Sequence, residues 1–316
     1  MTRPRPTESS AVPDRSQIRT EQRNPRSSSL HRLDVEACVR LIAEEDRAVF
    51  DAMRAASGSI AALIKAIEPR FLAGGRLIYL GAGTSGRLGV LDASEAPPTF
   101  QVEPGRIVGI IAGGDQALRR SSEGLEDDPE GARCDLAALG LTARDSIIGI
   151  AAGGTTPYVL GAFGLVKGAD AGALTALLTC AHVPRPPHCD LMVVLETGPE
   201  VLTGSTRMKA GTATKLALNT ISTTLMVRGG KVYENLMVDL RATNLKLRDR
   251  AARIVATLTG LTRTEALGLL DRAGGSAKVA IAMQRLAIGP EDAAARLARA
   301  NGRLDILLES RPETRS

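Results

Sequence analysis

Aromatic side chains are almost absent from this chain of 316 residues: they make up 2% of it, and there is no tryptophan. Binding of nucleic acid by base stacking on aromatic rings is therefore disfavoured. Long apolar runs are missing too, since no stretch of about 18 apolar residues is available to span a bilayer. The N-terminus also lacks the apolar segment of a secretory signal. We therefore expect a cytoplasmic protein that binds neither membranes nor nucleic acid.

Metal-ligand patterns and a basic face are also missing. The four cysteines show no CxxC spacing, and His182, His188 and Cys189 match no standard zinc pattern. We therefore expect reduced, structural cysteines and no metal. The net charge of +5 arises mostly in residues 1–32, where seven Arg and three acidic residues leave a net charge of +4. A basic tail on a nearly neutral body does not indicate a nucleic-acid interface.

One segment near residue 80 carries the clearest functional signal. The apolar run Leu77–Leu80 predicts a buried strand, a turn rich in Gly, Ser and Thr follows it, and a helical pattern begins near Leu88. The free backbone N–H groups at such a helix start bind anions, and a phosphate ester is the expected ligand. The candidate phosphate-binding residues in this turn are Gly83, Thr84, Ser85, Gly86 and Arg87.

Two nucleotide-binding alternatives fit this turn less well. Gly81, Gly83 and Gly86 satisfy the Gly-x-Gly-x-x-Gly spacing of dinucleotide-binding proteins, but no acidic residue ends a strand about 20 residues later. The lysine of a P-loop is missing. A tight turn without a ligand is a third possibility.

Strand and helix patterns alternate through most of the chain. Further strands are expected at 107–112, 146–151, 174–179 and 191–195, with helices between several of them, one of these over 115–132. Such alternation predicts an α/β fold, a three-layer parallel sheet with helices on both faces. Helical patterns also precede the sheet in residues 33–69, divided at Gly58, and follow it. We expect three parts: a partly disordered basic segment (1–32), a sugar-phosphate-binding domain (33–245) and a helical C-terminal module (246–310).

Three segments rich in Gly, Ser and Thr follow predicted strands. Besides 81–87, they are 153–156 and 203–206. Because ligands of parallel sheets bind beyond the carboxyl ends of the strands, all three segments are expected to face one crevice. They add the candidate phosphate-binding residues Thr155, Thr156, Thr203, Ser205 and Thr206.

Two glutamates are candidates for acid and base chemistry. Glu95 lies in a segment with two prolines, 92–98, which is expected to be a stiff loop, and Glu126 is expected on the helix after the second strand. Two carboxylates from different elements suit general acid and base catalysis, although both residues could instead lie on a solvated surface. Lys209 could bind an anion or lie on a helix surface, and Lys215 is expected to be solvated.

Several of these segments together resemble one family. Residues 81–99 resemble the signature of the N-acetylmuramic acid 6-phosphate etherases, enzymes with a sugar isomerase (SIS) domain that are related to the glucokinase regulatory protein. The resemblance covers about residues 20–305, and its further matches are 20–24, 111–114, 123–127, 203–213 and 235–239.

The resemblance implies a SIS-type fold and a lyase that cleaves the D-lactyl ether of N-acetylmuramic acid 6-phosphate. The products are N-acetylglucosamine 6-phosphate and D-lactate, formed by removal of the C2 proton, loss of lactate from C3 and addition of water. Glu95 then corresponds to the general acid, with a raised pKa, and Glu126 to the second catalytic acid, for which the role of C2 base is expected. The resemblance implies no cofactor, a homodimer with a shared active site, and a role in cell-wall amino sugar recycling.

The chain departs from this pattern after the third strand. The usual Ser-Gly-Arg-Thr-Pro is replaced by residues 153–157, Gly-Gly-Thr-Thr-Pro, which lack the Ser hydroxyl and the Arg charge of that pattern but keep the hydroxyl groups of Thr155 and Thr156. This difference leaves open a sugar-phosphate sensor without catalytic activity and a sugar-phosphate isomerase of the same fold. The retained Glu95 and Glu126 favour the etherase, since a sensor needs no acid and base pair. A DNA-binding regulator fits least, because no basic recognition helix is evident in 33–69.

Overall fold

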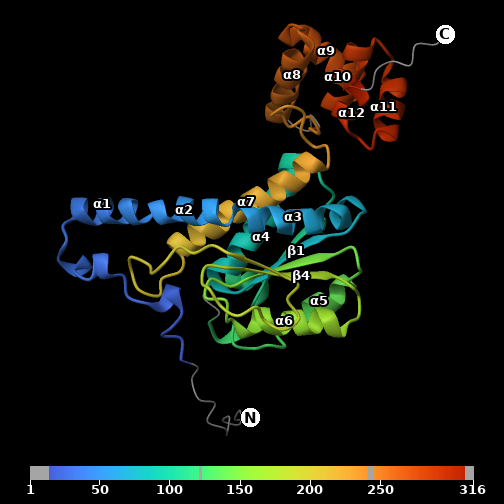
Figure 1. Ribbon diagram of the computed structural model, residues 1–316. Helices are drawn as coiled ribbons and strands as arrows, with labels where there is room; N and C mark the ends of the chain where they lie inside the picture. The colour runs from blue at the N-terminus through green and yellow to red at the C-terminus, as the bar shows by residue number, and fades with distance from the viewer. Residues whose placement is uncertain (1–13, 121–122, 241–244, 310–316) are drawn as a thin grey trace.

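A five-stranded parallel sheet forms the centre of the computed structural model, which describes residues 14–120, 123–240 and 245–309 (Figure 1). Its strand order is β2-β1-β3-β4-β5, and all neighbours pair in parallel. The strands are β1 (Leu77–Gly81), β2 (Ile107–Ile111), β3 (Ser146–Ile150), β4 (Leu174–Thr179) and β5 (Leu191–Val194). The predicted α/β class is confirmed.

Helices cover both faces of this sheet. One layer contains α3 (Ser57–Leu72), α4 (Gly83–Phe100) and α7 (Lys209–Arg228), and the other contains α5 (Arg133–Leu139) and α6 (Pro157–Gly168). Side chains alternate along β1, so that Leu77 and Tyr79 lie in the first core while Ile78 and Leu80 lie in the second. Both faces of the strand are therefore buried, which explains why its sequence is apolar throughout.

The N-terminal helices differ from the sequence-based prediction. The chain forms three short 3-10 turns, η1 (Arg19–Glu21), η2 (Pro25–Ser27) and η3 (Leu30–Arg32), and then α1 (Val35–Glu45) and α2 (Arg47–Ala55). The helices divide at Asp46 and Ala56, and Gly58 lies within α3, so the predicted division at Gly58 is wrong. In Figure 1, α1 and α2 form one arm, of which α1 projects from the body while α2 packs against α7 and buries Val49 in the core.

The segment between β2 and β3 also corrects a prediction. The helix expected over 115–132 is absent from the described part of this segment, which instead contains η4 (Gly114–Leu118) and η5 (Glu123–Leu125); α5 begins only at Arg133. Gly113 and Gly114 have φ angles of 88° and 63°, so the chain turns where a helix would start.

The C-terminal helices pack around a core of their own, made by residues between Val238 and Leu304. In Figure 1 they form a lobe joined to the rest by a narrow neck. They are α8 (Leu245–Thr259), α9 (Arg263–Arg272), α10 (Ala277–Leu286), α11 (Pro290–Arg299) and α12 (Leu304–Glu309). The boundaries at 32 and 245 stay predictions, and residues 1–13 and 310 lie outside the described ranges. Within those ranges, no helix combines the length and apolar character that a bilayer requires.

Candidate functional site

A cavity of about 380 Å³ lies at the carboxyl ends of β1 and β3. The strand order places β2 on one side of β1 and β3 on the other, so the chain changes direction across the sheet at this point. Ligands of doubly wound sheets bind at such a position. The lining residues are Arg15, Ile18, Glu21, Ala82, Gly83, Thr84, Ser85, Glu126, Asp127, Ala152, Gly153, Thr155, Thr156, Pro157, Gly204 and Thr206.

The N-terminus of α4 is open toward this cavity. Ala82 occupies its N-cap position, so no side chain caps the helix, and its first turn holds no acidic residue. Half-buried Thr84 and Ser85, in this first turn, line the cavity. A helix start without its own cap offers several hydrogen-bond donors and a partial positive charge to an anion.

Glycines bring α4 close to the sheet. A Cβ atom on Gly86 would lie 2.6 Å from the Gly81 carbonyl oxygen and 2.7 Å from Ile111 Cγ1, so only glycine fits there. Gly83, with a φ of 52°, allows the turn from β1 into the helix. Gly83 lines the cavity, whereas the role of Gly86 seen here is close packing.

Arg87 is directed to backbone carbonyl groups outside the cavity wall. Its Nε donates to the Ala117 carbonyl oxygen at 3.0 Å, and its Nη2 donates to the Arg120 carbonyl oxygen at 3.2 Å. The guanidinium therefore holds the segment after β2 against α4. Its predicted phosphate contact stays a prediction.

The two other Gly, Ser and Thr segments contribute unequally. Thr155 and Thr156 line the cavity, and Thr156 is the N-cap of α6 without a capping side-chain hydrogen bond. Pro157 at the first helical position has no N–H, and the N–H groups of Tyr158 and Val159 already have carbonyl partners. This segment therefore offers hydroxyl groups to the cavity rather than free helix N–H groups. From the segment 203–206, Gly204 and Thr206 line the cavity, whereas Thr203 and Ser205 lie outside its lining.

Glu126 is the predicted catalytic carboxylate that lines the cavity. It is half-buried on the turn after η5. The helical position expected from the sequence is therefore wrong. The Glu126 carbonyl oxygen accepts a hydrogen bond from the backbone N–H of Tyr158 at 3.0 Å, which ties this turn to α6. The turns predicted to bind phosphate and a carboxylate therefore share one cavity.

Glu95 lies elsewhere. The expected loop over 92–98 is wrong, because these residues form the last turns of α4 despite Pro97 and Pro98. Each proline removes only the hydrogen bond of its own missing N–H group, and Gln101 closes the helix with a φ of 53°. Glu95 is exposed on this helix and is absent from the cavity wall. The burial expected to raise its pKa is absent from this single chain.

Residues 15–27, the N-terminal strap, complete the cavity wall. Arg15, Ile18 and Glu21 line the cavity. Asn24 Nδ2 donates to Glu45 Oε2 at 2.6 Å, and Ser27 Oγ donates to the Val201 carbonyl oxygen at 2.7 Å. These buried bonds anchor the strap beside the cavity.

The anchor of the strap is a buried ion pair. Lys209 Nζ lies 2.8 Å from Glu45 Oε2, and both side chains are almost inaccessible. Burial opposes the charge on Glu45, but Lys209, Asn24 and Arg26 together outweigh it and hold the pKa of this carboxyl below its usual value. Lys209 is thus a structural residue. Half-buried Lys215 lies 3.6 Å from the buried carboxylate of Asp92 and is not simply solvated.

Analysis of the sequence missed Arg15, Glu21 and Asp127 as wall residues. Asp127 follows Glu126 directly, and the segment 20–24, which contains Glu21, resembles the N-terminal substrate-side segment of the etherase family, although no single residue in it was assigned a role. Neither the pattern of charges nor helical periodicity predicts that the strap contacts residues far from it in sequence. Among the residues that the structure describes, no three His, Cys, Asp or Glu side chains gather as a metal site would require.

Comparison with known proteins gives the following similarities. The glucokinase regulatory protein N-terminal SIS domain matches residues 59–167. The N-acetylmuramic acid 6-phosphate etherase of Synechococcus sp. (strain CC9605) is 52% identical over 285 residues, 90% of each chain. That of Pectobacterium atrosepticum is 49% identical over 286 residues, 90% of this chain and 94% of the relative. A phosphoheptose isomerase structure from Francisella tularensis has 16% identity and a TM-score of 0.43, covering 63% of this chain and 99% of its own.

Proposed function

The chain belongs to the N-acetylmuramic acid 6-phosphate etherase family, and from that premise we propose that it cleaves the D-lactyl ether of N-acetylmuramic acid 6-phosphate. The products are N-acetylglucosamine 6-phosphate and D-lactate. The observation that carries this proposal is the cavity in which the uncapped start of α4 faces the carboxylate-bearing turn of Glu126. Because its substrate is a charged sugar phosphate that does not cross membranes unaided, the proposed compartment is the cytoplasm.

The phosphate group binds at the start of α4. The backbone N–H groups of its first turn and the hydroxyl groups of Thr84 and Ser85 supply donors on one side, and Thr155 and Thr156 supply donors on the other. Binding energy at the phosphate then holds the sugar in a fixed register, so that its C2 and C3 atoms lie at a constant distance from the cavity wall.

Glu126 is the proposed base. In the open-chain sugar, C2 lies next to the aldehyde, so its proton is acidic enough for a carboxylate to remove. The electron pair left at C2 then expels the lactate oxygen from C3, which leaves a double bond between C2 and C3. Water adds across this bond, its oxygen to C3 and a proton to C2, and the amino sugar phosphate results.

Glu95 is the proposed acid that protonates the departing lactate oxygen, and it acts in the site of a second copy of the chain. Gly83 lines the cavity at the start of α4, and Glu95 lies twelve residues along the same helix. With a rise of about 1.5 Å per residue, this spacing separates the two by about 18 Å. A Glu side chain does not bridge that distance within one chain.

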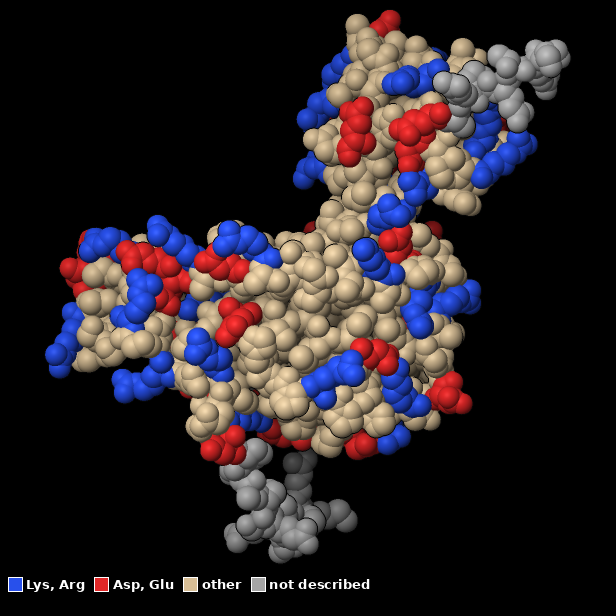
Figure 2. Space-filling model, in the orientation of Figure 1, with Lys and Arg blue, Asp and Glu red and all other residues tan. Residues whose placement is uncertain are grey.

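Exposed apolar surface supports a homodimer. Val35, Val39 and Phe50 of the arm are 74%, 62% and 69% exposed, and Leu91, one turn before Glu95, is 42% exposed. A groove of about 830 Å³ lies beside the arm, between α3 and α7, with Met53, Ile60 and Ile64 in its wall. Figure 2 shows an uncharged surface across the middle of this face, with Lys, Arg, Asp and Glu around its edges. Burial of this surface against a second copy is the proposed source of dimer stability.

D-lactate release from N-acetylmuramic acid 6-phosphate tests the proposed reaction. The purified protein is expected to release one D-lactate for each N-acetylglucosamine 6-phosphate formed, and Glu126→Gln is expected to abolish the release. Asp128→Asn is the matched control, because Asp128 is exposed two residues away and lies outside the cavity wall. Substrate binding without lactate release by the unmodified protein would contradict the proposal.

A further inference from the structure

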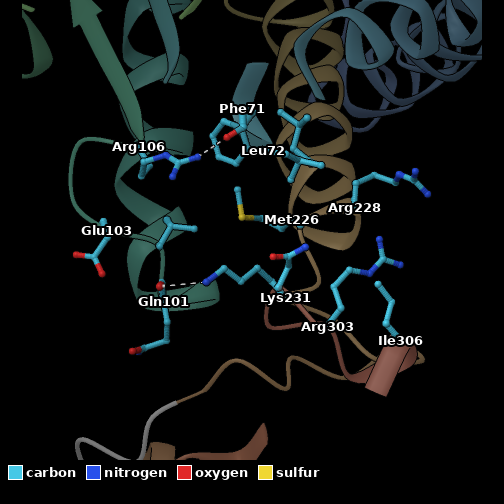
Figure 3. Close-up of a pocket in the computed structure, with 14 residues that line it drawn as sticks. Phe71, Leu72, Gln101, Glu103, Arg106, Met226, Arg228, Lys231, Arg303 and Ile306 are labelled. Carbon is cyan, nitrogen blue, oxygen red and sulfur yellow. Dashed lines mark hydrogen bonds between the residues drawn. The ribbon is translucent and has the colours of Figure 1, made fainter. Parts of the chain in front are cut away.

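A second hollow lies at the opposite edge of the sheet, between the body and the C-terminal lobe. Its volume is about 570 Å³, within the range of sites for small metabolites. From the body, its wall includes Phe71 at the end of α3 and Val102, just after α4. The C-terminal lobe contributes Asn301, Arg303 and Ile306 (Figure 3). We call this hollow the junction pocket.

The junction pocket is far from the cavity of the candidate site. Helix α4 begins with Gly83 in the wall of the cavity and ends at Phe100, next to Gln101 in the wall of the pocket. Its 18 residues correspond to a length of about 27 Å. A molecule in one site therefore does not touch the other.

Basic residues dominate the charged part of the pocket wall, which contains four of them and one acidic residue, Glu103. The basic residues are Arg106, Arg228, Lys231 and Arg303. Three of these have carboxylate partners outside the wall: Arg228 lies 2.8 Å from Glu68, and Lys231 and Arg303 pair with Asp239 and Asp305.

The C-termini of three helices balance a part of this positive charge. Helices α3, α4 and α7 all end at the pocket, and each carries a partial negative charge there. Arg106 Nη2 donates to the Phe71 carbonyl oxygen at 2.6 Å, and Lys231 Nζ lies 3.5 Å from the Gln101 carbonyl oxygen. Both contacts are drawn in Figure 3.

Arg106 has no negatively charged partner in the described part of the chain after these contacts. Its guanidinium stacks over the Phe71 ring at 4.5 Å from the ring centre, and no carboxylate of the described residues lies within 4.0 Å of it. Its Nε is buried and has no hydrogen-bond partner. Burial lowers the pKa of Arg106, which is the sign of a charge that no anion compensates. A partly buried guanidinium in this state is stabilised by an oxyanion that approaches its remaining N–H groups from the pocket.

We propose that the junction pocket binds a small phosphorylated metabolite, with Arg106 as the main partner of its phosphate group. The carbon skeleton of the ligand then lies against the apolar part of the wall, where Met226, Val102 and Ile306 are found. Because Arg303 belongs to the C-terminal lobe, the bound molecule also joins that lobe to the body. This site is independent of the proposed function, since it neither uses nor requires Glu95 or Glu126.

A fluorescent reporter in the pocket tests this proposal without any measurement of activity. The chain has no tryptophan, so Ile306→Trp introduces a single reporter in the pocket wall. Glucose 6-phosphate and inorganic phosphate, added at constant ionic strength, are expected to change its fluorescence until saturation, whereas acetate is expected to leave it unchanged. A linear response without saturation, or an equal response to acetate, would overturn the proposal.

Charge variants then identify the partner of the phosphate group. In the reporter background, Arg106→Gln is expected to weaken phosphate binding at least tenfold, because a charge-assisted hydrogen bond is lost, and Arg106→Lys is expected to restore part of this binding. Arg299→Gln, at an exposed position of α11 outside the pocket, is the control. Equal affinity in the Arg106→Gln and Arg299→Gln variants would exclude Arg106 as the partner and overturn the proposal.

Calorimetry on the chain with Ile306 retained shows whether the pocket binds the ligand when the Trp substitution is absent. Titration with glucose 6-phosphate is expected to show two classes of site, the cavity and the junction pocket, and Arg106→Gln is expected to remove one class. If the unmodified chain and the Arg106→Gln variant both show a single class, the junction pocket does not bind this ligand and the proposal fails.

Discussion

Glu126 lines the cavity at the start of α4, whereas Glu95 lies on the same helix about three turns beyond that start, exposed to solvent. Two carboxylates that act on neighbouring carbon atoms of one sugar must approach the same molecule. A single chain does not bring them together. The proposed reaction, with Glu95 as its acid, therefore requires a second copy of the chain.

Substitution of the two glutamates is expected to separate the two halves of the reaction. Glu126→Gln removes the base, so exchange of the C2 proton with deuterated water and lactate release are both expected to fall by a factor of about 100 to 10,000. Glu95→Gln is expected to retain exchange at C2 and to lose lactate release. Mass spectrometry of recovered substrate measures the exchange. Loss of exchange in Glu95→Gln, with retention in Glu126→Gln, would mean that the roles are reversed.

Removal of one charge from the ion pair that anchors the N-terminal strap is expected to lower the unfolding free energy strongly. Glu45→Gln leaves Lys209 buried beside a neutral amide, and such an uncompensated charge typically costs about 3–5 kcal/mol of unfolding free energy. The double variant Glu45→Gln, Lys209→Met removes both charges and is expected to recover part of the loss. Urea denaturation of both variants measures this difference. A double variant less stable than Glu45→Gln alone would contradict the account.

Two hydroxyl groups in the strap are expected to differ in their effect on stability. Thr20 is fully buried and its Oγ1 has no hydrogen-bond partner, so Thr20→Val is expected to leave the melting temperature unchanged or to raise it. Ser27 Oγ donates to the Val201 carbonyl oxygen, so Ser27→Ala is expected to cost about 1 kcal/mol. Calorimetric melting of the two variants compares them. A larger loss of stability in Thr20→Val than in Ser27→Ala would show that the Thr20 hydroxyl has a hydrogen-bond partner in solution.

Gly153 offers a direct way to supply that missing partner. A Cβ atom at this position would lie 3.7 Å from Thr20 Oγ1, without a closer contact. Gly153→Ser is therefore expected to fit and to raise the melting temperature slightly, with Gly153→Ala as the control that adds the carbon without the hydroxyl. Equal melting temperatures for the two variants would show that no bond to Thr20 forms.

Stability at low pH is expected to depend on the buried carboxylate of Asp145. Burial opposes its charge, but hydrogen bonds from Arg76 and Thr142 outweigh this effect and lower its pKa to about 2. The unfolded chain has a pKa near 3.9 for Asp, so the pair contributes about 2 kcal/mol above that pH, and this contribution disappears as the pH falls from about 4 to 2. Urea denaturation of the unmodified chain and of Asp145→Asn over this pH range measures how steeply the unfolding free energy changes with pH. Equal pH dependence in the two proteins would contradict the lowered pKa of Asp145.

The sequence predicted the sheet well because each strand is short, apolar and followed by a turn. The run Leu77–Leu80 is buried on both faces, and local pattern alone identifies such a strand. The strand–turn–helix unit at residues 77–100 was predicted for the same reason, since strand, glycines and helix start are adjacent in sequence, and its binding of phosphate stays a prediction. Thr84, Ser85, Thr155 and Thr156 all line the cavity as the alternation of strands and helices suggested.

What the sequence could not predict depends on contacts between distant segments. Prolines at 97 and 98 suggested a loop, but α4 continues through them because its C-terminal turns are packed against the sheet core through Ala93 and Ala96. The strap reaches the cavity through bonds between Asn24 and Glu45 and between Ser27 and Val201, which no local pattern encodes. The orientation of Arg87 away from the cavity is likewise decided by carbonyl groups about 30 residues away.

Complementation between two inactive variants tests the central claim most directly. Glu95→Gln and Glu126→Gln are expected to release almost no D-lactate when each is assayed alone. If each active site uses Glu126 of one copy and Glu95 of the other, mixed dimers contain one intact site of two, and random mixing is expected to restore about a quarter of the unmodified activity. A mixture that exchanges subunits and still releases no D-lactate would contradict the shared site.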